Sequence, residues 1–136
     1  MRVVYMPRVL IVDDSAAVRG ILCDLLSENF DCDTAGSAEV AFQCFEAETY
    51  DVILTDVALP DASGIDLMKQ VRLRDSETPV IMISGTLDEE QIQAAMQSGA
   101  FAYVKKPFDL DEIEQVVKRA FAKTCEAREE AFQNTR

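Results

Sequence analysis

The sequence alternates five times between a short apolar run and a longer segment in which apolar residues recur at helical spacing. The first run, residues 8–12 (R-V-L-I-V), predicts a strand, and Ser15 can cap the helix that follows it. That helix is indicated by apolar residues every three or four positions, at Val18, Ile21, Leu22, Leu25 and Leu26. A strand followed at once by a helix is the repeating unit of α/β proteins, so this alternation limits the fold more than any other feature.

The remaining runs continue the same order. Strands are expected at residues 32–35, 52–54, 79–83 and 101–104, and helices from Ser37, from about Gly64 to Leu73, from Asp88 to about Gln97 and from Asp109. Residues 32–35 are only a weak strand, but the other strands are continuous apolar runs, which is typical of a sheet covered on both faces. Right-handed crossovers then give parallel strands. We therefore predict an α/β fold with a doubly wound, five-stranded parallel sheet and five helices.

Length and charge limit the function. A chain of 136 residues fits one domain. Its 25 acidic and 13 basic residues give a net charge of -12, so no direct binding to nucleic acid is expected. The longest apolar runs are far too short to cross a membrane, and the start of the chain has no signal-peptide pattern. We expect a cytoplasmic protein without membrane contact.

The residue types also exclude some chemistry. The chain has no histidine, which excludes Ser-His-Asp and Cys-His catalysis and most zinc enzymes. The four cysteines, Cys23, Cys32, Cys44 and Cys125, match no metal or redox spacing. A disulfide pair stays open as an alternative, but buried free thiols are favoured.

Polar residues follow four of the five expected strands. They are Asp13 and Asp14, Thr55 and Asp56, Ser84 and Thr86, and Lys105 and Lys106. Because ligands bind beyond the carboxyl ends of parallel strands, these side chains are expected to converge. Three close carboxylates repel one another unless a cation, a proton or a lysine lies among them. Oxygen ligands of this kind suit Mg²⁺, and a carboxylate can be a nucleophile that forms an aspartyl phosphate.

Four segments carry a resemblance to a known family. V-L-I-V-D-D-S, I-L-T-D-V-A-L-P-D-A-S-G, I-M-I-S-G-T and Y-V-K-K-P-F occur in the order found in receiver domains of two-component response regulators, the CheY-like family. Each motif alone is weak, but the four together are specific. The resemblance covers about residues 7–121 and implies the strand order 2-1-3-4-5.

The resemblance assigns roles by position. It implies that Asp56 is the phosphoacceptor, that Asp14, Asp56 and the Ala58 backbone carbonyl bind Mg²⁺, and that Asp13 acts through a metal-bound water. Lys106 would pair with the phosphoryl group, joined to Pro107 by a cis bond, while Lys105 stays solvated. Ser84 would donate its hydroxyl to the phosphoryl group. One departure is that Ala58 has no polar side chain where many relatives carry one.

The family also implies a route for the signal. Ser84 would move toward the phosphoryl group, and Tyr103 would turn from an outward to an inward position. The surface formed by the fourth helix, fifth strand and fifth helix would then change. That surface would contact a downstream protein, an output domain or a second copy. The phosphate would come from a histidine kinase or a phosphotransfer protein. We expect the receiver domain at residues 1–122, and a helix extension or linker stub at residues 123–136.

Simpler interpretations compete with this one. Taken singly, Asp14 or Ser15 could be a helix cap, Asp56 a turn residue, Lys106 a surface lysine and Tyr103 plain packing. Among other functions, a haloacid-dehalogenase-type phosphatase would place D-x-D after its first strand, whereas this chain has D-D. A flavodoxin-like FMN carrier would have a Ser/Thr/Gly-rich loop there. The favoured interpretation is a phosphoacceptor switch that assists its own phosphorylation and dephosphorylation, and not a conventional enzyme.

Overall fold

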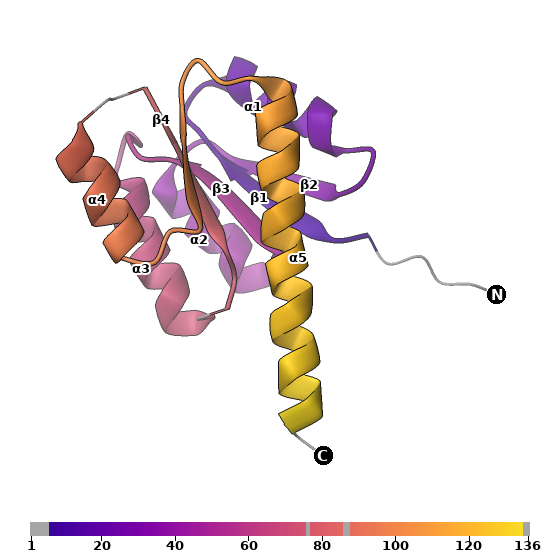
Figure 1. Cartoon of the computed structure of the whole chain (residues 1–136). Coiled ribbons are helices and arrows are strands. Elements are labelled where there is room, and N and C mark those ends of the chain that lie inside the picture. The colour runs from indigo at the N-terminus through magenta and orange to yellow at the C-terminus, as the bar shows by residue number, and fades with distance from the viewer. Residues whose placement is uncertain (1–5, 76, 86–87, 135–136) are drawn as a thin grey trace.

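The computed structural model describes residues 6–75, 77–85 and 88–134. Its centre is a parallel sheet in the order β2-β1-β3-β4-β5, which confirms the fold class and the strand order (Figure 1). The strands are β1 (Arg8–Val12), β2 (Asp31–Ala35), β3 (Val52–Asp56), β4 (Val80–Ser84) and β5 (Ala102–Lys105). The helices are α1 (Ala16–Leu26), α2 (Ala38–Ala47), α3 (Gly64–Arg74), α4 (Glu89–Gln97) and α5 (Leu110–Asn134).

Short polar residues cap the start of all five helices. Each accepts a hydrogen bond from a backbone N–H in the first turn of its helix: Ser15 for α1, Ser37 for α2, Ser63 for α3, Asp88 for α4 and Asp109 for α5. Such a cap satisfies an amide that otherwise has no partner within the helix. The caps place each helix directly after the loop that leaves a strand end.

The helices cover the two faces of the sheet, as the unbroken apolar strands predict (Figure 1). Along β1, Val9 and Ile11 pack with residues of α1 and α5, whereas Leu10 and Val12 pack with residues of α2, α3 and α4. Successive strand side chains point to opposite faces, so one apolar strand supplies both cores. The carboxyl ends of the central strands remain open for the site.

Some sequence expectations need correction. Ile21 was expected on the apolar face of its helix, but its side chain is 49% exposed because it lies at the border of the α1 stripe, while Leu22 and Leu26 are buried. The four cysteines are free, as favoured, yet none is fully buried and Cys125 is exposed. In addition, β3 continues to Asp56, so this residue ends the strand instead of following it.

The last helix, α5, has 25 residues and extends past the sheet. Two of its side chains hold it to Asp51, at the amino end of β3. The Thr124 Oγ1 donates to the Asp51 backbone carbonyl at 2.7 Å. Arg128 forms an ion pair with the Asp51 carboxylate, whose Oδ2 also accepts from the Arg8 amide at 2.7 Å. We call Asp51, Thr124 and Arg128 the α5 latch. Among the described residues, no helix is both long and apolar enough to span a membrane.

Candidate functional site

Strand register gathers the predicted residues at one edge of the sheet. Asp56 pairs with Ile83 in β4, and Ser84 pairs with Lys105 in β5. Asp13 directly follows β1, whose last residue pairs with Thr55. The structure therefore brings the carboxylates, the hydroxyl and the lysine to neighbouring strand ends, as the sequence predicts.

Lys106 joins two of the carboxylates. Its Nζ lies 2.7 Å from Asp13 Oδ2 and 2.7 Å from Asp56 Oδ2. Asp13 is 1% exposed and Asp56 is 7% exposed, so the ammonium lies against two almost fully buried acids. Such buried carboxylates need charged or hydrogen-bonding partners, and Lys106 supplies one to each.

Backbone amides hold the other oxygens of the same two side chains. Asp13 Oδ1 accepts from the Ser15 amide at 2.9 Å, and Asp56 Oδ1 accepts from the Ala58 amide at 2.9 Å. Each carboxylate is thus fixed by a backbone N–H on one oxygen and by Lys106 on the other. This orientation leaves the side chain of Asp56 in one defined position at the end of β3.

The local charges act on Lys106 in opposite directions. Burial lowers its pKa, whereas its hydrogen bonds to Asp13 and Asp56 raise it, and the net result is a pKa above the usual 10.5. The lysine therefore stays protonated throughout the neutral range. Its positive charge is a permanent part of the site near pH 7.

The donor set fits Mg²⁺. Asp14 is exposed, and one carboxylate oxygen each from Asp13, Asp14 and Asp56 lies within 4.8 Å of the others. Three carboxylates and one ammonium leave a formal charge of about -2 among these four groups, which favours a divalent cation. Hard oxygen ligands of this type are those that Mg²⁺ prefers. The amide of Ala58 contacts Asp56, and the role of the Ala58 carbonyl stays a prediction.

The remaining predicted residues lie around this centre. Ser84 is buried at the end of β4, and its carbonyl accepts from the Lys106 amide at 2.7 Å. Lys105 is exposed, as expected, and the Lys106–Pro107 bond is cis, as predicted. Thr86 lies outside the described residues.

Tyr103 belongs to β5 and packs partly against the core that α2, α3 and α4 cover. Its hydroxyl is buried and, within the described residues, has no hydrogen-bond partner. The sequence predicts that this side chain starts in an outward position. In this structure the hydroxyl is already buried, so the outward start is not observed and the rotation itself stays a prediction.

Sequence reasoning assigned no structural role to Asp61, in the loop after β3, and did not show why Gly64, the first residue of α3, must be glycine. A Cβ added to Gly64 would lie 2.2 Å from the Asp56 carbonyl oxygen, so only glycine allows α3 to start this close to the site. Asp61 accepts from the amides of Ala38 and Glu39, both at 2.9 Å, and thereby ties the loop to α2. The D-A-S-G segment holds both residues, but its pattern does not show which helix Asp61 reaches.

Comparison with known proteins identifies the family. The model for the response regulator receiver domain matches residues 9–118. The chain belongs to the response regulator receiver family. Receiver domains are regulatory switches of two-component systems, and their acidic pocket, which corresponds to the Asp cluster described above, is where the family binds Mg²⁺.

Curated relatives are longer than this receiver domain. The regulatory protein AtoC of Escherichia coli is 38% identical over 114 residues, which are 83% of this chain and 25% of AtoC. The cell cycle transcriptional regulator CtrA of Caulobacter vibrioides is 36% identical over 115 residues, 82% of this chain and 50% of CtrA. The chain spans about a quarter of the length of the first curated relatives, in which the receiver domain is joined to further sequence.

Solved structures share the fold over nearly the whole chain. The chemotaxis response regulator CheY4 of Vibrio cholerae has a TM-score of 0.80 at 28% identity, covering 85% of this chain and 99% of CheY4. NtrX from Brucella abortus, solved in complex with ADP, has a TM-score of 0.87 at 28% identity, covering 93% of this chain and 30% of NtrX. The same receiver architecture thus occurs alone and as part of longer chains.

Proposed function

We propose that this receiver domain accepts a phosphoryl group on Asp56, with Mg²⁺ bound, from a histidine kinase or a phosphotransfer protein. The observation that supports this most is the bridge from Lys106 to Asp13 and Asp56, at 2.7 Å each. It places the ammonium of Lys106 against Asp56, the buried candidate nucleophile, at the strand ends where the carboxylates gather. The family membership of the chain supports the same function.

Each residue would have a defined part in the transfer. A carboxylate oxygen of Asp56 forms a bond to phosphorus while the bond from phosphorus to the donor nitrogen breaks, and the leaving nitrogen keeps the electron pair. Lys106 and the Ser84 hydroxyl would contact the phosphoryl oxygens. Asp13, Asp14, Asp56 and the Ala58 carbonyl would hold Mg²⁺, with Asp13 acting through a water. When bound, the ion would supply positive charge that offsets the negative charge of the carboxylate and the phosphate.

The signal would leave through the surface of α4, β5 and α5. Phosphorylation adds charge beside Ser84, whose movement would change the space next to Tyr103 in β5. The apolar face of α4 is small, because Ala95 is buried while Met96 is 44% exposed, so a shift of this helix would disturb few contacts. A few kcal/mol of preference for the active state would shift most of the population. A downstream protein, an output domain or a second copy would bind this surface, in the cytoplasm. The end of α5, residues 123–134, would extend from the receiver domain as a helix.

The first test is labelling with acetyl phosphate in the presence of Mg²⁺. We expect one alkali-labile phosphate per chain on Asp56, located by peptide mapping. Asp56→Asn should abolish this label, and chelation of Mg²⁺ should remove most of it. Asp24→Asn, which changes an exposed carboxylate on α1, is the matched control and should label like the wild type. A label on any other residue of the wild-type chain would contradict the assignment.

The same experiment separates the alternative functions. A haloacid-dehalogenase-type phosphatase would release inorganic phosphate over many turnovers, whereas the proposed switch would accumulate a single acyl phosphate. A flavodoxin-like carrier would take up FMN and gain no phosphate. Continuous turnover or flavin binding would therefore replace the proposed function with one of these two.

A further inference from the structure

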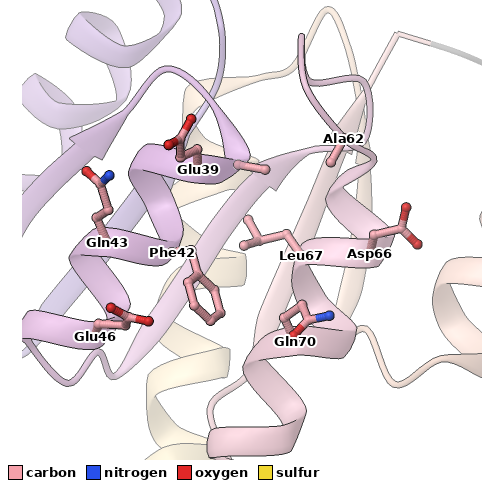
Figure 2. A pocket seen from close by; sticks show the side chains of 9 residues that line it. Glu39, Phe42, Gln43, Glu46, Ala62, Asp66, Leu67 and Gln70 are labelled. Carbon is pink, nitrogen blue, oxygen red and sulfur yellow. The ribbon is translucent and has the colours of Figure 1, made fainter.

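An open groove of about 550 Å³ lies between α2 and α3, and its lining residues belong to these two helices and to the loop before α3 (Figure 2). Its floor is apolar, with Phe42 from α2 and Leu67 from α3 between the two helices. Leu67 is buried, whereas the ring of Phe42 is only partly covered. Nothing in the proposed phosphoacceptor function uses this groove.

The aromatic floor already holds one cation of the chain itself. The guanidinium carbon of Arg74 lies 4.9 Å from the centre of the Phe42 ring. The same guanidinium is 3.1 Å from Glu46 Oε1. An aromatic face next to a carboxylate is a favourable environment for arginine or lysine. These contacts of Arg74 show that the Phe42 ring and the Glu46 carboxylate accept a guanidinium.

The rim of the groove is acidic on both sides. Glu39 and Glu46 stand along α2, and Asp66 stands along α3 (Figure 2). All three side chains are exposed. Leu73 follows Asp66 by seven residues, so it lies on the same face of α3, and it is 82% exposed, an unusual degree for a large apolar side chain. The surface thus combines apolar contacts in its centre with negative charge at its edges.

We propose that the groove between α2 and α3 is a docking surface for a cationic amphipathic helix of a partner protein. Leucine-like side chains of the partner would enter between Phe42 and Leu67, in the way that helices bind apolar grooves. Lysines or arginines beside them would pair with Glu39 and Asp66, and would share Glu46 with Arg74. The charge argues against a second copy of this chain as the occupant, because each copy carries a net charge of -12.

The groove also touches both segments that the Asp61 side chain joins. Ala38 and Glu39 of α2 line it, as does Ala62 of the loop after β3. Asp61 links these segments through its two hydrogen bonds to α2. A helix in the groove would therefore contact both segments at once. The partner would therefore meet a surface in which α2 and the loop after β3 are already held together.

The test uses two synthetic helical peptides of about 15 residues, long enough to form a helix. Both carry leucines three and four positions apart, one with lysines and arginines beside them and the other with glutamates there. Titration of the ¹⁵N-labelled chain with the cationic peptide should shift amide signals at residues 38–47 and 62–74. The acidic peptide should bind at least about tenfold more weakly. Raising the salt concentration from about 50 to about 300 mM should weaken the binding of the cationic peptide.

Variants then locate the binding energy. Phe42→Ala should lower the affinity for the cationic peptide about tenfold or more, as the loss of a central anchor side chain does. The triple variant Glu39→Gln, Glu46→Gln, Asp66→Asn should weaken it by about two- to fivefold for each lost pair. The matched control is the triple variant Glu89→Gln, Glu129→Gln, Asp111→Asn, which changes exposed acids at similar helix positions on α4 and α5. This control should bind like the wild type.

Several results would overturn the proposal. They are equal affinity for the two peptides, amide shifts outside the groove, or equal weakening by the two triple variants. Sedimentation equilibrium of the chain alone tests the other occupant. A wild-type dimer that Phe42→Ala disperses would assign the groove to a second copy instead. Phe42→Ala is checked for folding by circular dichroism, and the rim variant decides the question if that substitution unfolds the chain.

Discussion

Two buried tyrosine hydroxyls in this receiver domain differ in one respect. The hydroxyl of Tyr50 donates to Asp33 Oδ2 at 2.7 Å, and burial together with this bond raises the pKa of Tyr50 above its usual value. The hydroxyl of Tyr103 is buried without a hydrogen-bond partner among the described residues. A buried polar group without a partner costs about 1–3 kcal/mol. Within the described part of the chain, Tyr103 therefore carries a cost that Tyr50 does not.

Removal of the two hydroxyls should have opposite effects. We expect Tyr103→Phe to raise the free energy of unfolding by about 1 kcal/mol, because an unsatisfied group is removed. Tyr50→Phe should lower it by about 1 kcal/mol, because a hydrogen bond is lost and Asp33 loses a donor. Urea denaturation of both variants beside the wild type measures these changes. A loss of stability in Tyr103→Phe equal to that in Tyr50→Phe would show that its hydroxyl has a partner.

At the scale of elements, the Asp61 side chain connects the loop after β3 with the start of α2. Its two oxygens accept from the amides of Ala38 and Glu39, and these bonds lower its pKa below the usual 3.8. The unfolded chain binds this proton more readily than the folded chain does. The contribution of Asp61 to stability is therefore present above pH 3.8 and is lost as the pH falls through its folded pKa.

The acid dependence of this connection can be measured. Asp61→Asn should lower the urea midpoint at pH 7, because an amide oxygen can replace only one of the two acceptors and carries no charge. The difference between this variant and the wild type should shrink at an acid pH below the lowered pKa of Asp61, where the carboxylate loses its charge. Asp24→Asn removes an exposed carboxylate on α1 and should show no such pH-dependent difference. A constant difference at both pH values would contradict the role of the Asp61 charge.

Local patterns predict most of the elements and the carboxylate centre. Apolar runs that end on acids, together with capping residues such as Ser15 and Ser37, are read directly from neighbouring residues. The contacts of Asp61 with α2 and the exposure of Ile21 depend on how elements pack, which no local spacing shows. A side chain at Gly64 would also clash with the backbone carbonyl of Asp56, which lies eight positions earlier in the sequence. The sequence motif marks Gly64, but only the packed structure shows which atom excludes a Cβ.

The α5 latch belongs to the scale of the whole molecule, because it joins the later turns of α5 to the start of the central strand of the sheet. Arg128→Ala removes the ion pair with the buried Asp51 carboxylate. Arg128 is about half exposed, so we expect a loss of only about 1 kcal/mol in the free energy of unfolding. Arg119→Ala, an exposed substitution on the same helix, should change it by less than about 0.5 kcal/mol.

Hydrogen exchange adds a second measure of the same feature. Amides of α5 beyond Thr124 should exchange faster in Arg128→Ala than in the wild type, because the helix end opens more often. In Arg119→Ala the rates should stay as in the wild type. Unchanged exchange in Arg128→Ala would mean that Thr124 alone fixes the helix.

A helix of 25 residues is about 37 Å long, and its far end extends past the sheet (Figure 1). Without contacts along its side, the end of the helix would move on the nanosecond scale, independently of the rest of the domain. The latch lies at the amino end of β3, whereas Asp56 lies at the carboxyl end of the same strand. Because the latch holds the end of α5, a fluorophore attached at Glu129 should rotate together with the whole domain. Its fluorescence anisotropy should therefore decay at the rotational rate of the domain.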